Sequence, residues 1–225
     1  MRATLYGFIF LSGCIIFFFP DELDDFLFGE YYLEESYLVT RGDTTYEINS
    51  QAPFRGIGYL EHPNGQSYYE HKYREGKRVG EHILYYPNGD ISEKGNYKNG
   101  KLDGLVKGYY SDGSISYTRN YKNGKRDGLA EEYSSKGLYR SINYKNGLRH
   151  GLKTNYYVDT GKLDYSENYK NGKLDGFKFY YDSNEGIRDK VCFKSGVRQV
   201  TEIWKNNGVM DYLDKKVDNL DYCEK

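Results

Sequence analysis

Three of the four histidines lie close together in the sequence, at His62, His71 and His82. Imidazole nitrogens are common zinc ligands, so three of them brought together could hold a metal ion. The alternative is that they are surface substitutions, because similar segments elsewhere carry Tyr, Lys or Asp at these positions. The fourth, His150, stands where three similar segments carry Asp, which indicates a turn position. We therefore expect no metal site.

Aspartates recur at one place in these segments, at Asp103, Asp127 and Asp175. A row of carboxylates could bind calcium, but a calcium ion takes about six to eight oxygens that converge on one point. A hairpin repeat supplies one such carboxylate per ~10 Å of sheet, because strands lie about 4.8 Å apart. The spacing therefore favours a structural role in turns.

The sequence contains no G-x-S-x-G elbow, no P-loop and no H-E-x-x-H motif. We therefore predict that the protein is not an enzyme and needs no cofactor. Its net charge of −1 gives no basic footprint for nucleic acid. Lysines flank repeated turns at Lys98, Lys122, Lys145 and Lys170. They could form a basic edge that faces anionic lipid, but we favour the alternative that they keep exposed turns soluble.

The chain has three cysteines, Cys14, Cys192 and Cys223. Their odd number and wide spacing argue against a disulfide framework. Cys192 and Cys223 could pair if the C-terminal tail folds back, or they could remain free thiols.

The phrase Leu11-Ser12-Gly13-Cys14 lies inside an apolar run that extends from Ala3 to Phe19. This phrase resembles the bacterial lipoprotein box, in which the cysteine is lipidated and becomes the new N-terminus. The resemblance predicts lipidation of Cys14. An uncleaved membrane anchor and a cleaved secretory signal are the alternatives. All three direct the chain to a cell envelope.

Tyrosine is unusually frequent, with 27 tyrosines and 26 glycines among 225 residues. The aromatic ring offers a large apolar surface, and its hydroxyl can stay in contact with water. This composition suits a thin sheet better than a thick, dry core.

An eight-residue phrase, Tyr97 to Gly104, recurs at a spacing of about 24 residues. A second turn signal, such as Ser111-Asp112-Gly113, lies midway in each unit. Both signals favour two-residue hairpin loops, and the short runs between them suit strands. Copies of the phrase begin at Tyr73, Tyr97, Tyr121, Tyr144, Tyr169 and, in decayed form, Phe193.

We therefore predict an all-β fold: a single-layer antiparallel meander of about six 24-residue β-hairpin repeats, elongated and curved. Equivalent tyrosines should stack from unit to unit in two ladders, one along the series that begins at Tyr73 and one along the series that begins at Tyr85.

The pattern Gly-x4-Tyr-Tyr-x2-Gly…Tyr-x-Asn-Gly-Lys-x-x-Gly, seen from Gly104 to Gly128, resembles the bacterial MORN-repeat-variant family. The resemblance covers residues 56–199. It implies an elongated antiparallel sheet used for protein or membrane contact, without a catalytic centre. Some members carry a YwqK-type antitoxin label, so an antitoxin-like protein that neutralises a partner toxin is one alternative. Tryptophan, common in the eukaryotic form, occurs here only at Trp204.

Tyrosines are the candidate binding residues, because they give a large contact area at low entropic cost. Paired aromatics in glycine-rich hairpins are also similar to the choline- and glucan-binding repeats of cell-wall proteins, which makes a cell-wall or glycan-binding module the second alternative. The candidates are Tyr85, Tyr86, Tyr109, Tyr110, Tyr133, Tyr156, Tyr157 and Tyr181.

We expect four segments: a signal, lipoprotein or membrane-anchor segment at 1–19, an acidic tether at 20–35, a MORN-like array at 36–213 with full repeats at 56–199, and a tail at 214–225. The predicted function is a non-catalytic scaffold that binds an unknown protein of the envelope or the exterior, with a membrane surface or a glycan as further partners. The expected location is the bacterial cell envelope, as a membrane-tethered lipoprotein, with a membrane anchor or secretion as alternatives.

Overall fold

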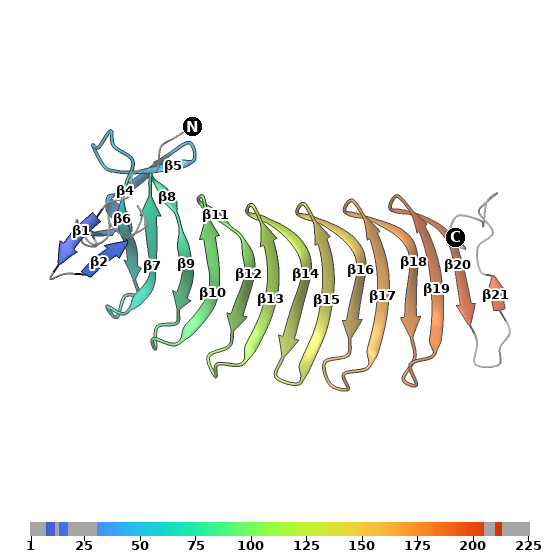
Figure 1. Cartoon of the computed structure of the whole chain (residues 1–225). Coiled ribbons are helices and arrows are strands. Elements are labelled where there is room, and N and C mark those ends of the chain that lie inside the picture. The colour runs from blue at the N-terminus through green and yellow to red at the C-terminus, as the bar shows by residue number, and fades with distance from the viewer. Residues whose placement is uncertain (1–7, 12–13, 18–30, 205–209, 213–225) are drawn as a thin grey trace.

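The computed structural model describes residues 8–11, 14–17, 31–204 and 210–212, with side chains described for residues 31–199. Within these residues the chain is all β apart from one 3₁₀ turn, η1 (Glu35–Tyr37). One extended sheet runs the length of the molecule (Figure 1). Its strands are β3 (Tyr32–Glu34), β6 (Gly56–Glu61), β7 (Ser67–Arg74), β8 (Lys77–Arg78), β9 (Gly80–Tyr85), β10 (Ile91–Lys98), β11 (Lys101–Leu102), β12 (Gly104–Tyr109), β13 (Ile115–Lys122), β14 (Lys125–Ser134), β15 (Gly137–Lys145), β16 (Leu148–Tyr156), β17 (Leu163–Lys170), β18 (Lys173–Tyr181), β19 (Ile187–Lys194), β20 (Val197–Trp204) and β21 (Met210–Tyr212).

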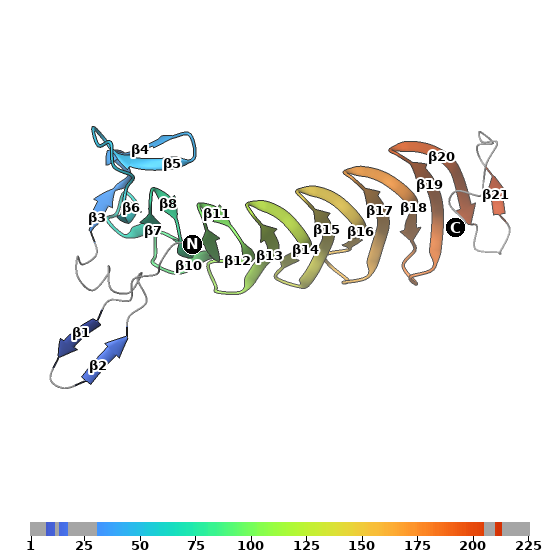
Figure 2. The same ribbon diagram turned by 45° about the horizontal axis from the view of Figure 1, so that its top comes forward.

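From β6 onward, successive strands pair antiparallel, each with the next along the chain except at the short strands β8 and β11. β8 is followed directly by β9, and both pair with β7. In the same way β11 is followed by β12, and both pair with β10. This order confirms the predicted all-β antiparallel meander of hairpins. The strands arch rather than lie flat, as the tilted view shows (Figure 2).

The Asn-Gly turns are two-residue loops, as predicted. Lys98 pairs with Lys101, and between them Asn99 and Gly100 have φ values of 50° and 76°. Positive φ at both loop residues defines the hairpin turn whose twist matches that of the strands. These turns form one edge of the sheet, which we call the turn edge.

Most midway turns differ from the prediction of two-residue loops, although the turn between the paired residues Ser134 and Gly137 has two residues, as predicted. Tyr110 donates its N–H to the Ser114 carbonyl at 2.8 Å, which leaves a three-residue loop that ends in Gly113, with φ of 83°. A three-residue loop needs one left-handed residue at its end, and Gly113 supplies it. The pairing register shifts beside this loop, between Gly108 and Tyr109.

Backbone hydrogen bonds also join each unit to the next at the turn edge. The N–H of Gly124 donates to the Leu102 carbonyl at 2.8 Å, and that of Gly147 to the Arg126 carbonyl at 2.7 Å. Each Asn-Gly turn therefore rests on the preceding unit, which makes the sheet a chain of nearest-neighbour contacts.

Paired residues point to the same side of a sheet, and neighbours along a strand point to opposite sides. The pairs Gly104 with Tyr121 and Val106 with Arg119 therefore define one side, which we call the ladder face. Leu105 and Tyr109 point to the other side, which we call the leucine face. The most deeply buried side chains, Tyr73 and Val106, lie on the ladder face, so this face holds the thin core.

The N-terminal end of the sheet is covered by residues 31–55. The strand β3 pairs in parallel with β6, and the hairpin of β4 (Leu38–Arg41) and β5 (Thr44–Glu47) lies beside it. Gly76 donates its N–H to the Phe54 carbonyl at 2.8 Å. In the other units the equivalent glycine donates to a carbonyl of the preceding repeat, so residues 31–55 take the place of a preceding repeat here. The segment expected as a tether, 20–35, is described only from residue 31, and Tyr32–Glu34 belong to the sheet.

Part of the predicted N-terminal targeting segment forms a hairpin, in which β1 (Phe8–Leu11) pairs with β2 (Cys14–Phe17). Leu11 and Cys14 are partners in this pairing. The side chain of Cys14, and the tail at 214–225, lie outside what the structure describes. In the described part of the chain we find no helix with the length and apolar character needed to cross a membrane.

Candidate functional site

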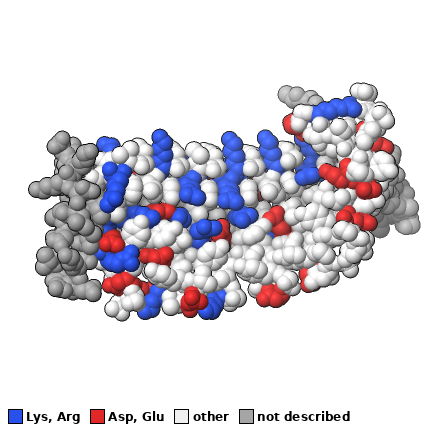
Figure 3. All heavy atoms as spheres, turned by 180° about the vertical axis from the view of Figure 1, so that it is seen from behind, with Lys and Arg blue, Asp and Glu red and all other residues white. Residues whose placement is uncertain are grey.

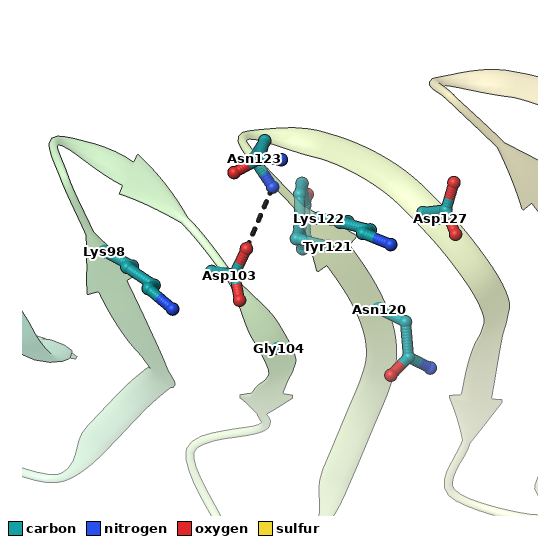
Figure 4. A pocket seen from close by; sticks show the side chains of 8 residues that line it. All are labelled: Lys98, Asp103, Gly104, Asn120, Tyr121, Lys122, Asn123 and Asp127. Atoms are coloured by element: carbon teal, nitrogen blue, oxygen red, sulfur yellow. Dashed lines mark hydrogen bonds between the residues drawn. The ribbon is translucent and has the colours of Figure 1, made fainter.

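Aspartates at the turn edge connect neighbouring units. The Asp103 carboxylate accepts a hydrogen bond from the backbone N–H of Asn123, in the next turn, at 3.0 Å (Figure 4). Asp127 accepts from the N–H of Asn146 at 2.9 Å, and Asp175 acts in the same way two units further on. The predicted structural role of these aspartates is confirmed, and its form is a cap on the following turn.

A surface pocket of about 420 Å³ lies at one of these joints, and Lys98, Asn120 and Lys122 contribute to its walls (Figure 4). The Asn120 amide donates to the Leu129 carbonyl at 2.8 Å. The Asn120 amide and the Asp103 carboxylate are therefore both hydrogen-bonded to backbone groups of the protein. We describe the pocket as a junction between two units.

His150 interrupts the row of capping aspartates. Its Nδ1 atom is buried and has no hydrogen-bond partner among the described residues. The turn that this position faces, at Asn171 and Gly172, keeps its backbone bond to the Arg149 carbonyl at 2.9 Å. His150 therefore occupies the predicted turn position but does not supply the cap.

Basic side chains stand along the turn edge, where the space-filling view shows them in a row (Figure 3). The four lysines that precede the Asn-Gly turns are all exposed, as are three that follow these turns. They are Lys98, Lys122, Lys145 and Lys170, and then Lys101, Lys125 and Lys173. Exposure of this kind is compatible with both alternatives, contact with anionic lipid and solubility of the edge.

The tyrosine ladder of the ladder face does not stack ring on ring. Arg126 lies between Tyr121 and Tyr144, donates to the Tyr144 hydroxyl at 3.1 Å and stands 5.2 Å from the centre of that ring. Arg149 makes the same contacts with Tyr169, at 3.2 Å and 5.3 Å. The prediction of stacked equivalent tyrosines was wrong because such residues are two strands, or about 10 Å, apart, beyond the range of ring pairs. An intervening arginine spans this gap.

These arginines stay charged in spite of partial burial. Burial lowers the pKa of Arg126, but hydrogen bonds with the Tyr121 and Tyr144 hydroxyls outweigh it and raise the pKa above its ordinary value. The ladder is thus an alternation of cations and aromatic rings.

A buried chain of polar side chains crosses the ladder face at β7, β9 and β10. The Nε2 atom of His71 lies 2.9 Å from Nδ1 of His82, and Nε2 of His82 lies 2.6 Å from a Glu93 oxygen. The Tyr117 hydroxyl donates to the other Glu93 oxygen. His71 and His82 are 3% and 4% exposed, so the expectation that they are surface substitutions was wrong.

Glycine makes this chain possible. The strand β12 lies between Glu93 and Tyr117, and Gly108 is the residue of β12 at that level. A Cβ atom on Gly108 would lie 2.2 Å from the Tyr117 ring, so the missing side chain lets the ring pass over the strand. The sequence alone does not indicate this role of Gly108, because most of the other glycines lie in turns and Gly108 looks like one more member of that series.

Burial controls protonation in this chain. Burial lowers the pKa of His71 to about 3, with smaller effects of Arg78 and His82, so His71 is neutral near pH 7. For Glu93, burial raises the pKa, but the hydrogen bonds from His82 and Tyr117 outweigh it and hold the pKa below its ordinary value. Among the described residues no group of three or more side chains could hold a metal ion.

A second buried polar cluster lies further along the ladder face. Glu167 binds the ammonium of Lys153 at 2.7 Å and that of Lys178 at 3.1 Å. The Tyr169 hydroxyl donates to the same carboxylate at 2.9 Å. Burial disfavours both charges, but the contacts outweigh it, raising the pKa of Lys153 and lowering that of Glu167. The cluster is satisfied internally, which indicates a structural role.

The leucine face exposes a leucine at the same position in three consecutive units. Leu105, Leu129 and Leu152 are 45%, 38% and 45% exposed, and successive ones are two strands apart. The strands between them carry Asn120 and Asn143, whose amides donate to the Leu129 and Leu152 carbonyls. The leucines therefore form a row that is fixed in place.

One series of the predicted binding tyrosines lies on this same face, because its members follow the leucine position by four residues. All of them are partly buried. They are Tyr85, Tyr109, Tyr133, Tyr156 and Tyr181. The structure thus brings these candidates together with leucines that the sequence did not single out.

The remaining candidates divide into two kinds. The hydroxyls of Tyr86 and Tyr110 donate to backbone carbonyls of the next unit, those of Tyr109 and Tyr133, at 2.7 Å and 2.6 Å. They are braces between units. Tyr157 is 43% exposed and makes no such bond to the next unit. Cys192 is buried and disulfide-bonded, and its partner cysteine lies outside the described side chains, so its pairing with Cys223 stays a prediction.

The fold and its contacts define a class: a repeat sheet whose units are joined by turn caps, arginine–tyrosine contacts and tyrosine braces. Two of its units, residues 78–99 and 102–123, match the family model of the MORN repeat variant. The predicted resemblance is confirmed for these two repeats. MORN repeats are generally modules for protein or membrane interaction. A search of curated proteins finds no match.

Proposed function

We propose that the protein is a non-catalytic scaffold that presents its leucine face to a protein partner. The observation that carries this proposal is the row of exposed Leu105, Leu129 and Leu152 beside a row of partly buried tyrosines. Aliphatic side chains exposed at a regular spacing on a rigid sheet offer more apolar area than solubility requires. Tyrosines beside them provide the large, rigid contacts that are typical of binding hot spots.

The ladder face supports the proposal by contrast. Its charged groups bind one another, and its arginines lie against tyrosine rings. A surface with its polar groups already paired has less to gain from a partner. The leucine face, in contrast, keeps its aliphatic side chains in water.

A triple variant tests this proposal. Leu105→Ser, Leu129→Ser and Leu152→Ser together should leave the fold intact, because these side chains are exposed, and should abolish cross-linking to the protein partner in cells. The matched control replaces Lys98, Lys122 and Lys145 by Ser on the turn edge and should keep the partner. Loss of the partner in the lysine variant alone would move the interaction to the turn edge and refute the proposal.

We further propose that the N-terminal segment tethers the sheet at a bacterial cell envelope through lipidated Cys14. The lipoprotein-like phrase supports this, and the disulfide at Cys192 agrees with an oxidising compartment. Fatty-acid labelling should be lost in Cys14→Ser, and equal labelling of the variant would refute lipidation. The size of the mature chain then separates a cleaved signal from an uncleaved anchor. Mass spectrometry of the cross-linked partner would also reveal a toxin, which would favour the antitoxin-like alternative.

A further inference from the structure

The midway loop after Tyr157 departs from the pattern of its sister loops. Tyr157 donates its N–H to the Lys162 carbonyl at 2.8 Å, which encloses four loop residues. The corresponding bonds of Tyr86 to Asp90 and of Asp182 to Gly186 enclose three. In a repeat protein, an inserted residue in one loop marks a place where function can act on an otherwise periodic chain.

The insertion changes the chemistry of the loop as well as its length. The first loop residue is Val158, where sister loops carry Pro87, Ser111 and Ser183. Val158 is 47% exposed and stands beside Tyr157, which is 43% exposed. Two adjacent side chains with apolar surface, Tyr157 and Val158, are thus exposed to solvent next to each other.

Between this loop and the next one lies a pocket of about 460 Å³. Tyr157, Val158 and Tyr181 line it, and Lys162 and Arg188 stand among its polar groups. The Lys162 ammonium donates to the Ser183 carbonyl and so connects the two loops. The pocket is therefore a built feature, of the size that small ligands occupy.

The Tyr157 ring is free to serve as a platform because its hydroxyl does not brace the next unit. Tyr110, one of its equivalents, donates to the Tyr133 carbonyl at 2.6 Å. The Tyr157 hydroxyl is instead hydrogen-bonded with Asp164, and this bond, together with the charge of Asp164, raises the pKa of Tyr157. The ring is anchored at one end while its surface stays exposed.

The charged side chains that line the pocket are of both signs, with Lys162 and Arg188 as cations and Asp159 and Asp182 as anions. Arg188 binds Asp189 at 2.8 Å, and the Asp182 carboxylate accepts from the N–H of Asn184 at 2.8 Å. Asp159 binds Lys136 at 2.8 Å. Because the lining carries as many cations as anions, it does not favour a strongly charged ligand.

We propose that this pocket binds a neutral carbohydrate. A sugar ring has an apolar side that can lie on an aromatic ring, and hydroxyls at its rim that both donate and accept hydrogen bonds. The Tyr157 ring and Val158 match the apolar side, and the mixed donors and acceptors around them match the hydroxyls. This site shares Tyr181 with the tyrosine row of the leucine face but includes none of the exposed leucines. Its test changes Tyr157, which lies outside that row, so it can fail or succeed separately from the proposed scaffold function.

Titration of the full chain with a panel of neutral oligosaccharides, including an N-acetylglucosamine trisaccharide and maltotriose, tests the proposal by calorimetry and protein-observed NMR. We expect saturable binding of at least one member that weakens tenfold or more in Tyr157→Ala and is retained in Tyr157→Phe. The matched control is Tyr110→Ala, the equivalent tyrosine two units away, which should not change affinity.

Three results would overturn the proposal. One is the absence of saturable binding across the neutral panel in protein that is folded by circular dichroism. Another is binding that Tyr157→Ala leaves unchanged. The third is tighter binding of the probe N-acetyl-tyrosinamide than of any sugar, which would assign the pocket to aromatic peptide side chains instead.

Discussion

At the scale of single residues, side chains reach partners that lie two strands away. Tyr117 reaches Glu93 across Gly108, and Arg126 fills the space between Tyr121 and Tyr144. A one-layer sheet has no second layer to bury its side chains, so they lie down along the sheet and bury one another. Stability therefore depends on particular small residues that leave room.

Gly108→Ala tests this dependence. The new Cβ would collide with the Tyr117 ring, and we expect the free energy of unfolding to fall by about 1–3 kcal/mol. Urea denaturation measures it. In a Tyr117→Ala background the same substitution should cost much less, because the ring is gone. Equal costs in both backgrounds would show that the ring does not need the space.

His150→Asp should stabilise the protein. The new carboxylate would accept the N–H of Asn171, as Asp127 accepts that of Asn146 at 2.9 Å, and would relieve the buried, unpartnered Nδ1 atom. We expect a gain of about 0.5–1.5 kcal/mol, the net value of one such hydrogen bond. The reference variant Asp127→Ala should lose a similar amount. A lower unfolding midpoint for His150→Asp would contradict the equivalence of these positions.

His71 should make stability fall as the pH drops from 7 to 5. In the unfolded chain a histidine takes up a proton near pH 6.5, whereas folded His71 has a pKa of about 3 and stays neutral. The unfolded state then binds more protons, and each pH unit below about 6.5 costs up to ~1.4 kcal/mol. Glu93 contributes a constant amount to the free energy of unfolding between pH 7 and pH 5. Its pKa is lowered in the folded protein, so its stabilising effect is fully present above about pH 4.5, the ordinary pKa of a glutamate. Unfolding curves of wild type and His71→Gln should diverge between pH 7 and pH 5, and parallel curves would disprove burial of a neutral imidazole.

At the scale of the strands and turns, the sequence predicts what repeats and misses what varies. The Asn-Gly turns and the hairpin period follow from local rules, since φ preferences act within a few residues. The row of His71, His82 and Glu93 does not, because its members come from three strands whose registers the sequence alone does not specify. Loop length and the shift beside Gly108 decide which residues meet. The same limit explains why the stacking of equivalent tyrosines was predicted wrongly. The contact that such a tyrosine makes depends on the residue of the strand in between, such as Arg126 between Tyr121 and Tyr144.

The candidate site shows the same division. The sequence indicated tyrosines at the Tyr109 position, since their spacing is regular, but it treated Tyr110 and Tyr157 as equivalent. The structure separates them, because one hydroxyl braces the next unit and the other is bound to Asp164. Exposed leucines such as Leu129 were not predicted as part of the binding surface, because an isolated exposed leucine carries no signal until strand pairing places it in a row.

At the scale of the whole molecule, the units share a backbone but are not interchangeable in their side chains. Deleting residues 104–127 joins Asp103 to Gly128, which are equivalent neighbours, and so keeps the strand directions and the turn edge. Deleting residues 104–115 removes one strand and reverses every strand that follows. We expect the first variant to unfold cooperatively and the second to aggregate, as monitored by circular dichroism and light scattering. Similar behaviour of both would contradict a hairpin unit.

The first deletion also has a specific defect that can be repaired. It brings Glu132 to the place of Gly108, directly beside Glu93, because both pair in the same row of the ladder face. Two half-buried carboxylates side by side repel each other. The shortened sheet should therefore lose more stability than the loss of one unit alone explains. Adding Glu132→Gly removes the repulsion and restores the open position across which a side chain can pass. Arg140, which pairs with Glu132 in the intact protein, can then reach Glu93 as Tyr117 does. The repaired deletion should therefore unfold at a higher urea concentration than the simple deletion. If the repair lowered that midpoint instead, the units would be held together by backbone contacts and the rows of side chains would not govern their order.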